Sequence, residues 1–243
     1  MKIKRYLFLV HRWLGIAMCL LFLMWFISGV VMMYIAFPSL TSQERLAGLP
    51  NLSANTILSD PHALIREIGA DNVDSLRLTT ILTRPAYLVK TKQGEFHSIF
   101  ADTGETTPEI TSKRALLAAQ IFYRHTHTNK ASKSTNTEPS IAQENVFVDQ
   151  WTVSSSLTPH RPLHKIALND EEDTYLYVST KSGEVVRDTT RHERIWNWLG
   201  ANLHWIYPVQ LRQHATVWHW VVVVLSFWGV LSVLTGGTIG LMG

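Results

Sequence analysis

The chain has 243 residues, a formal net charge of +3 and 46% hydrophobic residues, which by themselves allow one or two soluble domains. Its single cysteine, Cys19, excludes a fold held by intrachain disulfide bonds. The excess positive charge is confined to the N-terminus, where four basic residues precede every acidic residue: Lys2, Lys4, Arg5 and Arg12. The remaining 18 basic and 19 acidic residues balance, so the sequence argues against nucleic-acid binding.

Two stretches, 13–42 and 213–243, contain no charged residue. A helix needs about 20 apolar residues to cross the hydrocarbon core of a membrane, and both stretches exceed that length. The sequence therefore predicts two transmembrane helices, one over 6–37 that ends at Pro38 and one from His214 to the C-terminus. The first apolar run is about twice as long as that of a cleaved signal peptide, so we expect an uncleaved anchor.

The basic residues before the first helix predict a cytoplasmic N-terminus, because positively charged segments stay on that side. Both termini are then cytoplasmic, and the middle of the chain lies in the periplasm if the source is a Gram-negative bacterium. We divide the chain into a stub with the first helix (1–40), a periplasmic domain (41–191), an interfacial helix (192–213) and the second helix (214–243). The interfacial segment is dense in aromatic side chains typical of a membrane surface: Trp196, Trp198, Trp205 and Tyr207.

The periplasmic segment begins with local signals for a helix and a hairpin. Asp60 followed by proline is typical of a helix cap and first turn, and it predicts a short helix over 62–68. Segments 86–91 and 95–101 have the composition of strands. Gly94 lies in the turn between them and permits the positive φ of a hairpin.

The rest of this segment predicts another helix and a second group of strands. Alanines favour a helix over 113–124, and the polar residues 125–140 favour a loop. Strand-like segments follow at 146–153, 163–168, 174–179 and 185–188. The turn Lys181-Ser182-Gly183-Glu184 repeats Lys92-Gln93-Gly94-Glu95, which indicates two related αβ units unless the hairpins are alike by chance. Either way the sequence predicts an α+β domain between two transmembrane helices.

Eight short motifs stand out along the chain: His11-Arg12-Trp13-Leu14-Gly15, Phe26-Ile27-Ser28-Gly29, Phe37-Pro38-Ser39-Leu40, Asp149-Gln150-Trp151-Thr152-Val153, His160-Arg161-Pro162-Leu163-His164, Ser182-Gly183-Glu184-Val185-Val186, Trp196-Asn197-Trp198-Leu199-Gly200 and His204-Trp205-Ile206-Tyr207-Pro208. Together they resemble proteins with PepSY domains and PepSY-associated transmembrane helices, over nearly the whole chain except the loop after Arg124. The resemblance implies a bacterial inner-membrane protein with PepSY-type periplasmic domains. Some members of that family are linked to haem-dependent reduction of ferric iron or ferric siderophores. Many members carry four or more spanning helices, whereas this sequence predicts two.

His11 heads one face of the first predicted helix, which it forms with Gly15, Met18, Phe22, Trp25, Gly29 and Met32. The two glycines leave room for a partner backbone or a flat ring, and Met18 contributes an apolar wall. Such a surface suits haem b with the imidazole of His11 as an iron ligand, which the resemblance favours. The alternative is that His11 reaches the cytoplasmic headgroups beside Arg12.

Three further histidines lie near the outer surface of the predicted membrane: His204, His214 and His219. We take His204, which belongs to a motif of the resemblance, and His219 as candidate haem-iron ligands, and the more hydrated His214 as a further contact. His219 heads a stripe that equally suits close helix packing: Ser226, Gly229, Val233, Gly236 and Gly240. The alternative for His219 is an interfacial histidine between two tryptophans.

The candidate haem ligands fall at two depths, because His11 lies at the cytoplasmic edge and the others lie at the outer edge. About 30 Å of hydrocarbon core separates the two edges, so one iron cannot be shared between them. Either one haem level exists, or two levels form an electron path across the membrane. A bundle of four helices can enclose a cofactor better than two helices can. The sequence therefore predicts a homodimer with haem between the subunits. The alternative is a haem site within one subunit.

Histidines outside the predicted membrane form two groups. His125 and His127 are spaced two apart and are a further candidate iron site, although loops often hold histidines that have no task. His160 and His164 flank a proline. They either hold the two hairpin units together or form a docking place for an iron chelate.

The function that the sequence favours is a haem b oxidoreductase that passes electrons to a periplasmic ferric iron or ferric-siderophore acceptor. No flavin or nicotinamide fingerprint occurs, so the electrons must come from a separate reductase or a membrane quinol. No catalytic residue is identified. The alternative functions, both without a cofactor, are a membrane-anchored PepSY-type binding or regulatory module and an accessory protein of a transporter.

Overall fold

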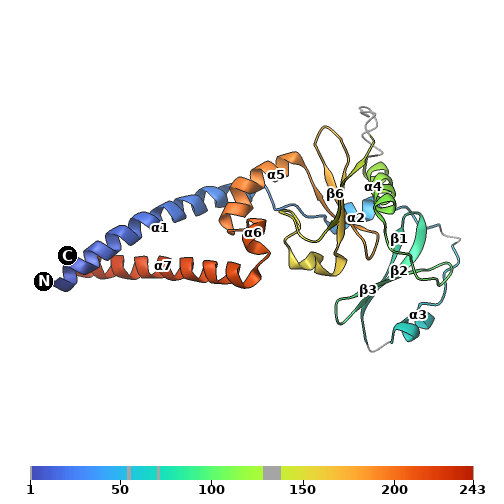
Figure 1. Ribbon diagram of the computed structural model, residues 1–243, viewed down its shortest axis with the longest axis horizontal. Helices are drawn as coiled ribbons and strands as arrows, with labels where there is room; N and C mark the ends of the chain where they lie inside the picture. Colours follow the sequence, from blue (N-terminus) through green and yellow to red (C-terminus); the bar gives the residue numbers. More distant parts are fainter. Residues whose placement is uncertain (1, 54–55, 70–71, 128–137, 243) are drawn as a thin grey trace. The chain divides into compact units, whose positions relative to one another are not determined.

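The computed structural model describes residues 2–53, 56–69, 72–127 and 138–242. The chain divides into two units, and Figure 1 gives the order of their elements. The helical unit comprises Met1–Phe37 together with Glu193–Gly243. The α+β unit comprises Pro38–His192.

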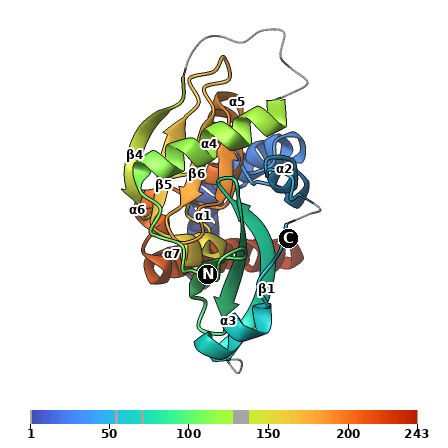
Figure 2. The same cartoon turned by 90° about the vertical axis from the view of Figure 1, so that its right-hand side faces the viewer.

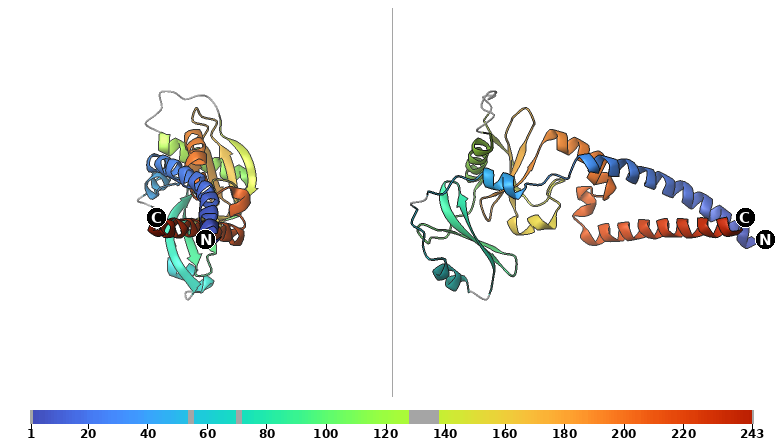
Figure 3. Two further views of the ribbon diagram at one scale, coloured as in Figure 1. Left: turned by 90° about the vertical axis from the view of Figure 1, so that its left-hand side faces the viewer. Right: turned by 180° about the vertical axis from the view of Figure 1, so that it is seen from behind.

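The helical unit is built on two long helices, α1 (Lys2–Tyr34) and α7 (Ala215–Met242). Both are long and apolar enough to cross a membrane, in agreement with the two charge-free stretches of the sequence. They run antiparallel and lie close together at the N-terminal end of α1 and the C-terminal end of α7 (Figure 3). They diverge toward their other ends, which makes room there for other parts of the same unit.

Short helical pieces precede α7: α5 (Arg191–Asn197), the π-helical turn η4 (Trp198–Asn202) and α6 (Val209–Arg212). The chain kinks at Gly200, where φ is −89° and ψ is −105°. A Cβ at Gly200 would lie 3.0 Å from Cγ1 of Val31, so glycine lets this turn approach α1. Asn197 is buried, and its Nδ2 donates to the carbonyl oxygen of Ala36 at 3.0 Å. The predicted interfacial helix is therefore a broken one that packs on α1.

The first part of the α+β unit is a three-stranded antiparallel sheet in the order β1 (Val73–Ile81), β2 (Arg84–Thr91) and β3 (Phe96–Phe100). The predicted hairpin is confirmed, with Gly94 at a φ of 86° in its turn. The helix predicted at 62–68 is also confirmed as α3 (Pro61–Ile68), and Asp60 accepts a hydrogen bond from the N–H of His62 at 2.9 Å. Strand β1 and the short helix α2 (Ser42–Ala47) were not predicted.

The second part is a four-stranded antiparallel sheet in the order β4 (Ser140–Val146), β5 (Leu163–Ala167), β6 (Tyr175–Ser179) and β7 (Val185–Thr189). Helix α4 (Ser112–His127) lies across one face of this sheet (Figure 2). Alanines on α4 permit that close approach, and the core between helix and sheet includes Ala115, Ala119, Phe122, Ile166, Leu176 and Val178. An α+β region with two antiparallel sheets is thus confirmed.

The strand predicted at 146–153 is wrong. The structure instead has β4 before this segment, and β4 ends at Val146. The residues that follow turn, because Asp149 Oδ1 accepts from the N–H of Trp151 at 3.0 Å and from the hydroxyl of Thr152 at 2.9 Å. The loop expected at 125–140 is shortened by α4, which continues to His127, and by β4. Its central part, 128–137, lies outside the described residues.

Candidate functional site

A pocket in the helical unit gathers the aromatic side chains near the divergent ends of α1 and α7. We call it the His204 pocket; its volume is about 480 Å³, and it is lined by Trp25, His204, Trp205, Ile206, Tyr207, Trp218 and Val222. This volume lies within the range of small-molecule sites, which is about 300–1,000 Å³. The lining comes from α1, from the turn after η4 and from the first turns of α7.

His204 is held against α1 on one side of its ring. Its Nδ1 lies 3.2 Å from the carbonyl oxygen of Trp25 and 3.1 Å from Oγ of Ser28. A carbonyl oxygen only accepts, so we assign the proton of the neutral imidazole to Nδ1 and the lone pair to Nε2. Nε2 makes no hydrogen bond to any residue that the structure describes. This nitrogen is therefore available to a ligand.

Gly29 lies directly beside the ring of His204. A Cβ at Gly29 would lie 3.4 Å from Cε1 of His204, at the short end of ordinary van der Waals contact. The sequence suggested that Gly29 leaves room for a partner backbone or a flat ring. In the structure, the imidazole of the same chain takes that room.

Aromatic rings and a strained residue form the rest of the pocket. The rings of Trp205 and Tyr207 lie 5.5 Å apart, and those of Tyr207 and Trp218 lie 5.8 Å apart. The indole of Trp218 donates to the carbonyl oxygen of Trp205 at 3.1 Å, which fixes its orientation. Ile206 has a φ of 52°, a left-handed conformation that costs a β-branched residue about 1–3 kcal/mol. Strain of this kind concentrates at binding sites because the surrounding contacts must enforce it.

His11 lies at the other end of α1 and is packed differently. Its Nδ1 is 3.0 Å from Oγ1 of Thr235, and that hydroxyl is bonded to the carbonyl oxygens of Leu231 and Ser232. A Cβ at Gly236 would lie 2.9 Å from Cε1 and 3.4 Å from Nε2 of His11. The imidazole therefore occupies the space that a side chain at position 236 would need.

The other residues of the predicted haem face differ in burial. Met18 is buried, whereas a Cβ at Gly15 would meet nothing within 4 Å. His214 and His219 are exposed, and the ring of His219 lies 5.7 Å from that of Trp220.

The residues of the predicted small-residue stripe of α7 also differ in their surroundings. Gly229 and Gly236 face Phe22 and His11 of the same chain, while Ser226, Val233 and Gly240 are exposed. His11 and His204 remain about 25 Å apart along α1, because His204 lies beside Ser28 and each helical residue rises by about 1.5 Å.

The two predicted haem levels therefore differ in their surroundings. At the His204 pocket, the residues present are compatible with a haem, because an imidazole with no described partner at Nε2 lines a space together with large aromatic rings. At His11, the ring is bonded to Thr235 and lies against Gly236 of α7, which fits a packing role better than a haem site.

His160 and His164, in the α+β unit, have structural contacts. Nε2 of His164, a buried residue, lies 2.9 Å from the carbonyl oxygen of Ile110, and His160 stacks on Phe96 with ring centroids 4.7 Å apart. Burial lowers the pKa of His160 below its usual value, while Glu184 raises it and Arg77 lowers it.

His125 is bonded within its own helix. Its Nδ1 lies 2.8 Å from the carbonyl oxygen of Ile121 within α4, and the ring is exposed. His127 ends the same helix. Within the described part of the chain, no group of three or more His, Cys, Asp or Glu residues is placed to hold a metal ion.

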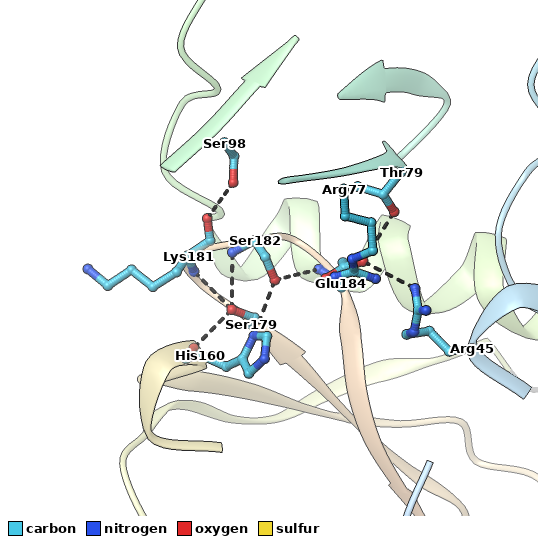
Figure 4. Close-up of polar contacts among 9 residues, drawn as sticks. All are labelled: Arg45, Arg77, Thr79, Ser98, His160, Ser179, Lys181, Ser182 and Glu184. Carbon is cyan, nitrogen blue, oxygen red and sulfur yellow. Dashed lines mark hydrogen bonds and ion pairs between the residues drawn. The ribbon is translucent and has the colours of Figure 1, made fainter. Parts of the chain in front are cut away.

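A buried ion-pair cluster in the α+β unit was not predicted (Figure 4). Glu184 accepts from the guanidinium of Arg77 at 2.7 Å and from the hydroxyl of Thr79 at 3.1 Å, and Arg45 lies 3.7 Å away. The side chain of Glu184 is 2% exposed. Burial, followed by the charge of Arg77, lowers the pKa of Arg45, and Glu184 opposes both. These contacts join β1 and α2 to the β6–β7 hairpin, which is a structural role.

A second pocket, of about 510 Å³, lies on the three-stranded sheet near α3. Its polar lining is mostly exposed, and Nε2 of His97 lies 4.0 Å from a carboxylate oxygen of Glu95. The His204 pocket has the more specific arrangement of groups, so we take it as the candidate site.

No protein-family model, no curated protein and no solved structure matches this chain. The family resemblance therefore rests on the sequence motifs alone.

Proposed function

We propose that this chain is a PepSY-like, membrane-anchored haem b protein that passes electrons to a ferric iron or ferric-siderophore acceptor in the periplasm. The observation that carries the proposal is His204, which lines an aromatic pocket, has Nδ1 bonded to the carbonyl oxygen of Trp25 and has no partner at Nε2 among the described residues. Histidines that ligate metals nearly always donate their other ring N–H to such an acceptor, which fixes the tautomer and makes the ligating nitrogen more basic.

Haem bound at this pocket would supply one-electron Fe(III)/Fe(II) chemistry. His204 would hold the haem iron through Nε2, and Ser28 and the carbonyl of Trp25 orient its ring. The rings of Trp205, Tyr207 and Trp218 give the pocket an apolar lining that would suit a flat macrocycle.

The proposed setting is the bacterial inner membrane, spanned by α1 and α7 with both termini in the cytoplasm. The exposed large apolar side chains along both helices support this setting, since a helix hydrophobic all round belongs in lipid. Among the described lining residues, His204 is the single histidine, so a second histidine for the haem would have to come from another copy of the chain. A homodimer is therefore part of the proposal, and a separate reductase or quinol is the proposed electron donor.

The test is the haem content of the full-length protein, expressed with haem supply and purified in detergent. We expect a reducible Soret band and stoichiometric haem by the pyridine haemochrome assay, both lost in His204→Ala. The matched control is His219→Ala, an exposed histidine of the same unit that should retain haem. Ferric-chelate reduction in vesicles should fall with haem content. Colourless wild-type protein would instead favour a binding or regulatory module without a cofactor.

A further inference from the structure

Arg212 is a cation without a charged partner at the edge of the His204 pocket. Its guanidinium carbon lies 5.3 Å from the ring centre of Tyr207 and 4.8 Å from that of Trp218, and both rings line the pocket. The side chain makes no hydrogen bond or ion pair with any residue that the structure describes, and its Nε is buried.

Such a placement leaves the hydrogen-bonding capacity of the arginine unused. Stacking on aromatic rings stabilises the positive charge and holds the planar group in one orientation, but it satisfies none of the N–H donors. A buried donor without an acceptor is costly, so this arrangement favours a partner that supplies oxygen atoms. The fork of a guanidinium matches the two oxygens of a carboxylate or phosphate.

We infer that Arg212 binds an oxyanion at the rim of the His204 pocket. The pocket lining carries no formal charge when His204 is neutral, so Arg212 supplies the positive charge at this site. On the function proposed above, the oxyanion is a propionate carboxylate of the haem. A phospholipid phosphate is the other source of the same chemistry, because the aromatic residues around Arg212 are typical of a membrane surface.

Arg212 also ends α6, where a cation interacts favourably with the last backbone carbonyls. If Arg212 had only this capping role, its substitution would affect folding. The affinity for a ligand would then not depend on the ligand's carboxylates, so an experiment can separate the two roles.

The first experiment reconstitutes the detergent-purified full chain with haem b or with its dimethyl ester, which lacks free carboxylates. In Arg212→Gln we expect about 10- to 100-fold weaker binding of haem b, the usual effect of losing a hydrogen bond between charged groups. Ester binding should be equal in wild type and Arg212→Gln, and Arg212→Lys should restore part of the affinity for haem b. The control is Arg12→Gln, which removes an arginine stacked on Trp13 at the far end of α1.

The second experiment measures phospholipid phosphate that remains bound per protein after delipidation. A loss of bound phosphate in Arg212→Gln, with haem b affinity unchanged, would support the oxyanion site with lipid as the source. Unchanged haem b affinity together with unchanged bound phosphate would overturn the inference, and so would equal weakening of haem b and its ester. If the wild type binds no haem, the proposed function fails while the phosphate measurement still decides the role of Arg212.

Discussion

Trp25 and His204 hold each other through two hydrogen bonds. The indole Nε1 of Trp25 donates to the carbonyl oxygen of His204 at 2.9 Å, and Nδ1 of His204 donates to the carbonyl oxygen of Trp25 at 3.2 Å. The pair joins α1 to the turn before α6, across 179 residues of sequence. One side chain thus fixes the backbone that carries the proposed ligand.

Trp25→Phe should loosen His204 while keeping an aromatic ring in the pocket. Loss of the indole donor leaves a partly buried carbonyl oxygen without its partner, which costs about 1–3 kcal/mol. We expect a lower thermal midpoint and a reduced haem content, measured by differential scanning fluorimetry and absorption spectroscopy. Trp220→Phe, at an exposed tryptophan of α7, is the control and should change neither quantity. Equal behaviour of the two variants would count against the role of Trp25.

Gly236→Leu should displace His11 and separate α1 from α7 within one chain. A Cβ at this position already lies 2.9 Å from the ring of His11, so a leucine forces repacking that costs about 1–3 kcal/mol. Gly237→Leu is the matched control, because a Cβ there meets nothing within 4 Å. We expect the thermal midpoint in detergent to fall for Gly236→Leu alone. If both variants lose stability alike, a contact between subunits at both positions becomes the better explanation.

Glu184→Gln should destabilise the α+β unit, since it leaves two arginines beside a neutral buried side chain. Breaking a fully buried ion pair costs roughly 3–5 kcal/mol, and the partial exposure of Arg77 lowers our expectation to about 2 kcal/mol. Urea unfolding of the full chain measures the change. Asp102→Asn, which removes the exposed partner of Arg84, should have a much smaller effect.

His160 should make the stability of the protein depend on pH below neutrality. Burial lowers the pKa of its imidazole from the usual 6.5, so the unfolded chain takes up the proton at higher pH than the folded chain does. The contribution of neutral His160 is therefore complete above pH 6.5 and is lost as the pH falls through the folded-state pKa. His160→Gln should make the urea midpoint change less as the pH falls below 6.5, and His62→Gln, at an exposed histidine, is the control substitution.

Membrane topology can be tested at positions where the fold tolerates change. In a Cys19→Ser background, we expect Gln93→Cys, on an exposed hairpin turn, to react with a membrane-impermeant maleimide from the periplasmic side. Lys4→Cys should react only after the inner membrane is opened, because the proposed orientation places the basic N-terminus in the cytoplasm. The opposite labelling pattern would reverse the proposed orientation.

The sequence by itself determined the elements that depend on local chemistry. Two charge-free stretches predict α1 and α7, because only a long apolar helix satisfies both the composition and the length. Asp60 and Gly94 mark a helix start and a hairpin through capping and positive φ, which act within a few residues. Helix α2 was overlooked although its capping box, Thr41 and Glu44, is visible in the sequence.

Tertiary structure decided the elements whose form depends on distant partners. In strand β1, polar and apolar residues do not alternate regularly. The strand is recognisable only because it pairs with β2. The π-turn at Gly200 exists because η4 packs on Val31, and the turn at Asp149 replaces a strand through side-chain hydrogen bonds. Helical and strand periodicity carries no information about either arrangement.

The candidate site shows the same division. The sequence identified His204 and His11 as candidate ligands. It predicted that the space beside Gly29 is filled by a flat ring or a partner helix. Only the fold shows that imidazoles of the same chain fill the notches at Gly29 and Gly236, and that Arg212 lies over the rings of the pocket. The type of each residue is known from the sequence, so candidate ligands can be predicted from it. Which side chain fills a given space depends on contacts between residues that are far apart in the chain, and those contacts form only when the helices pack.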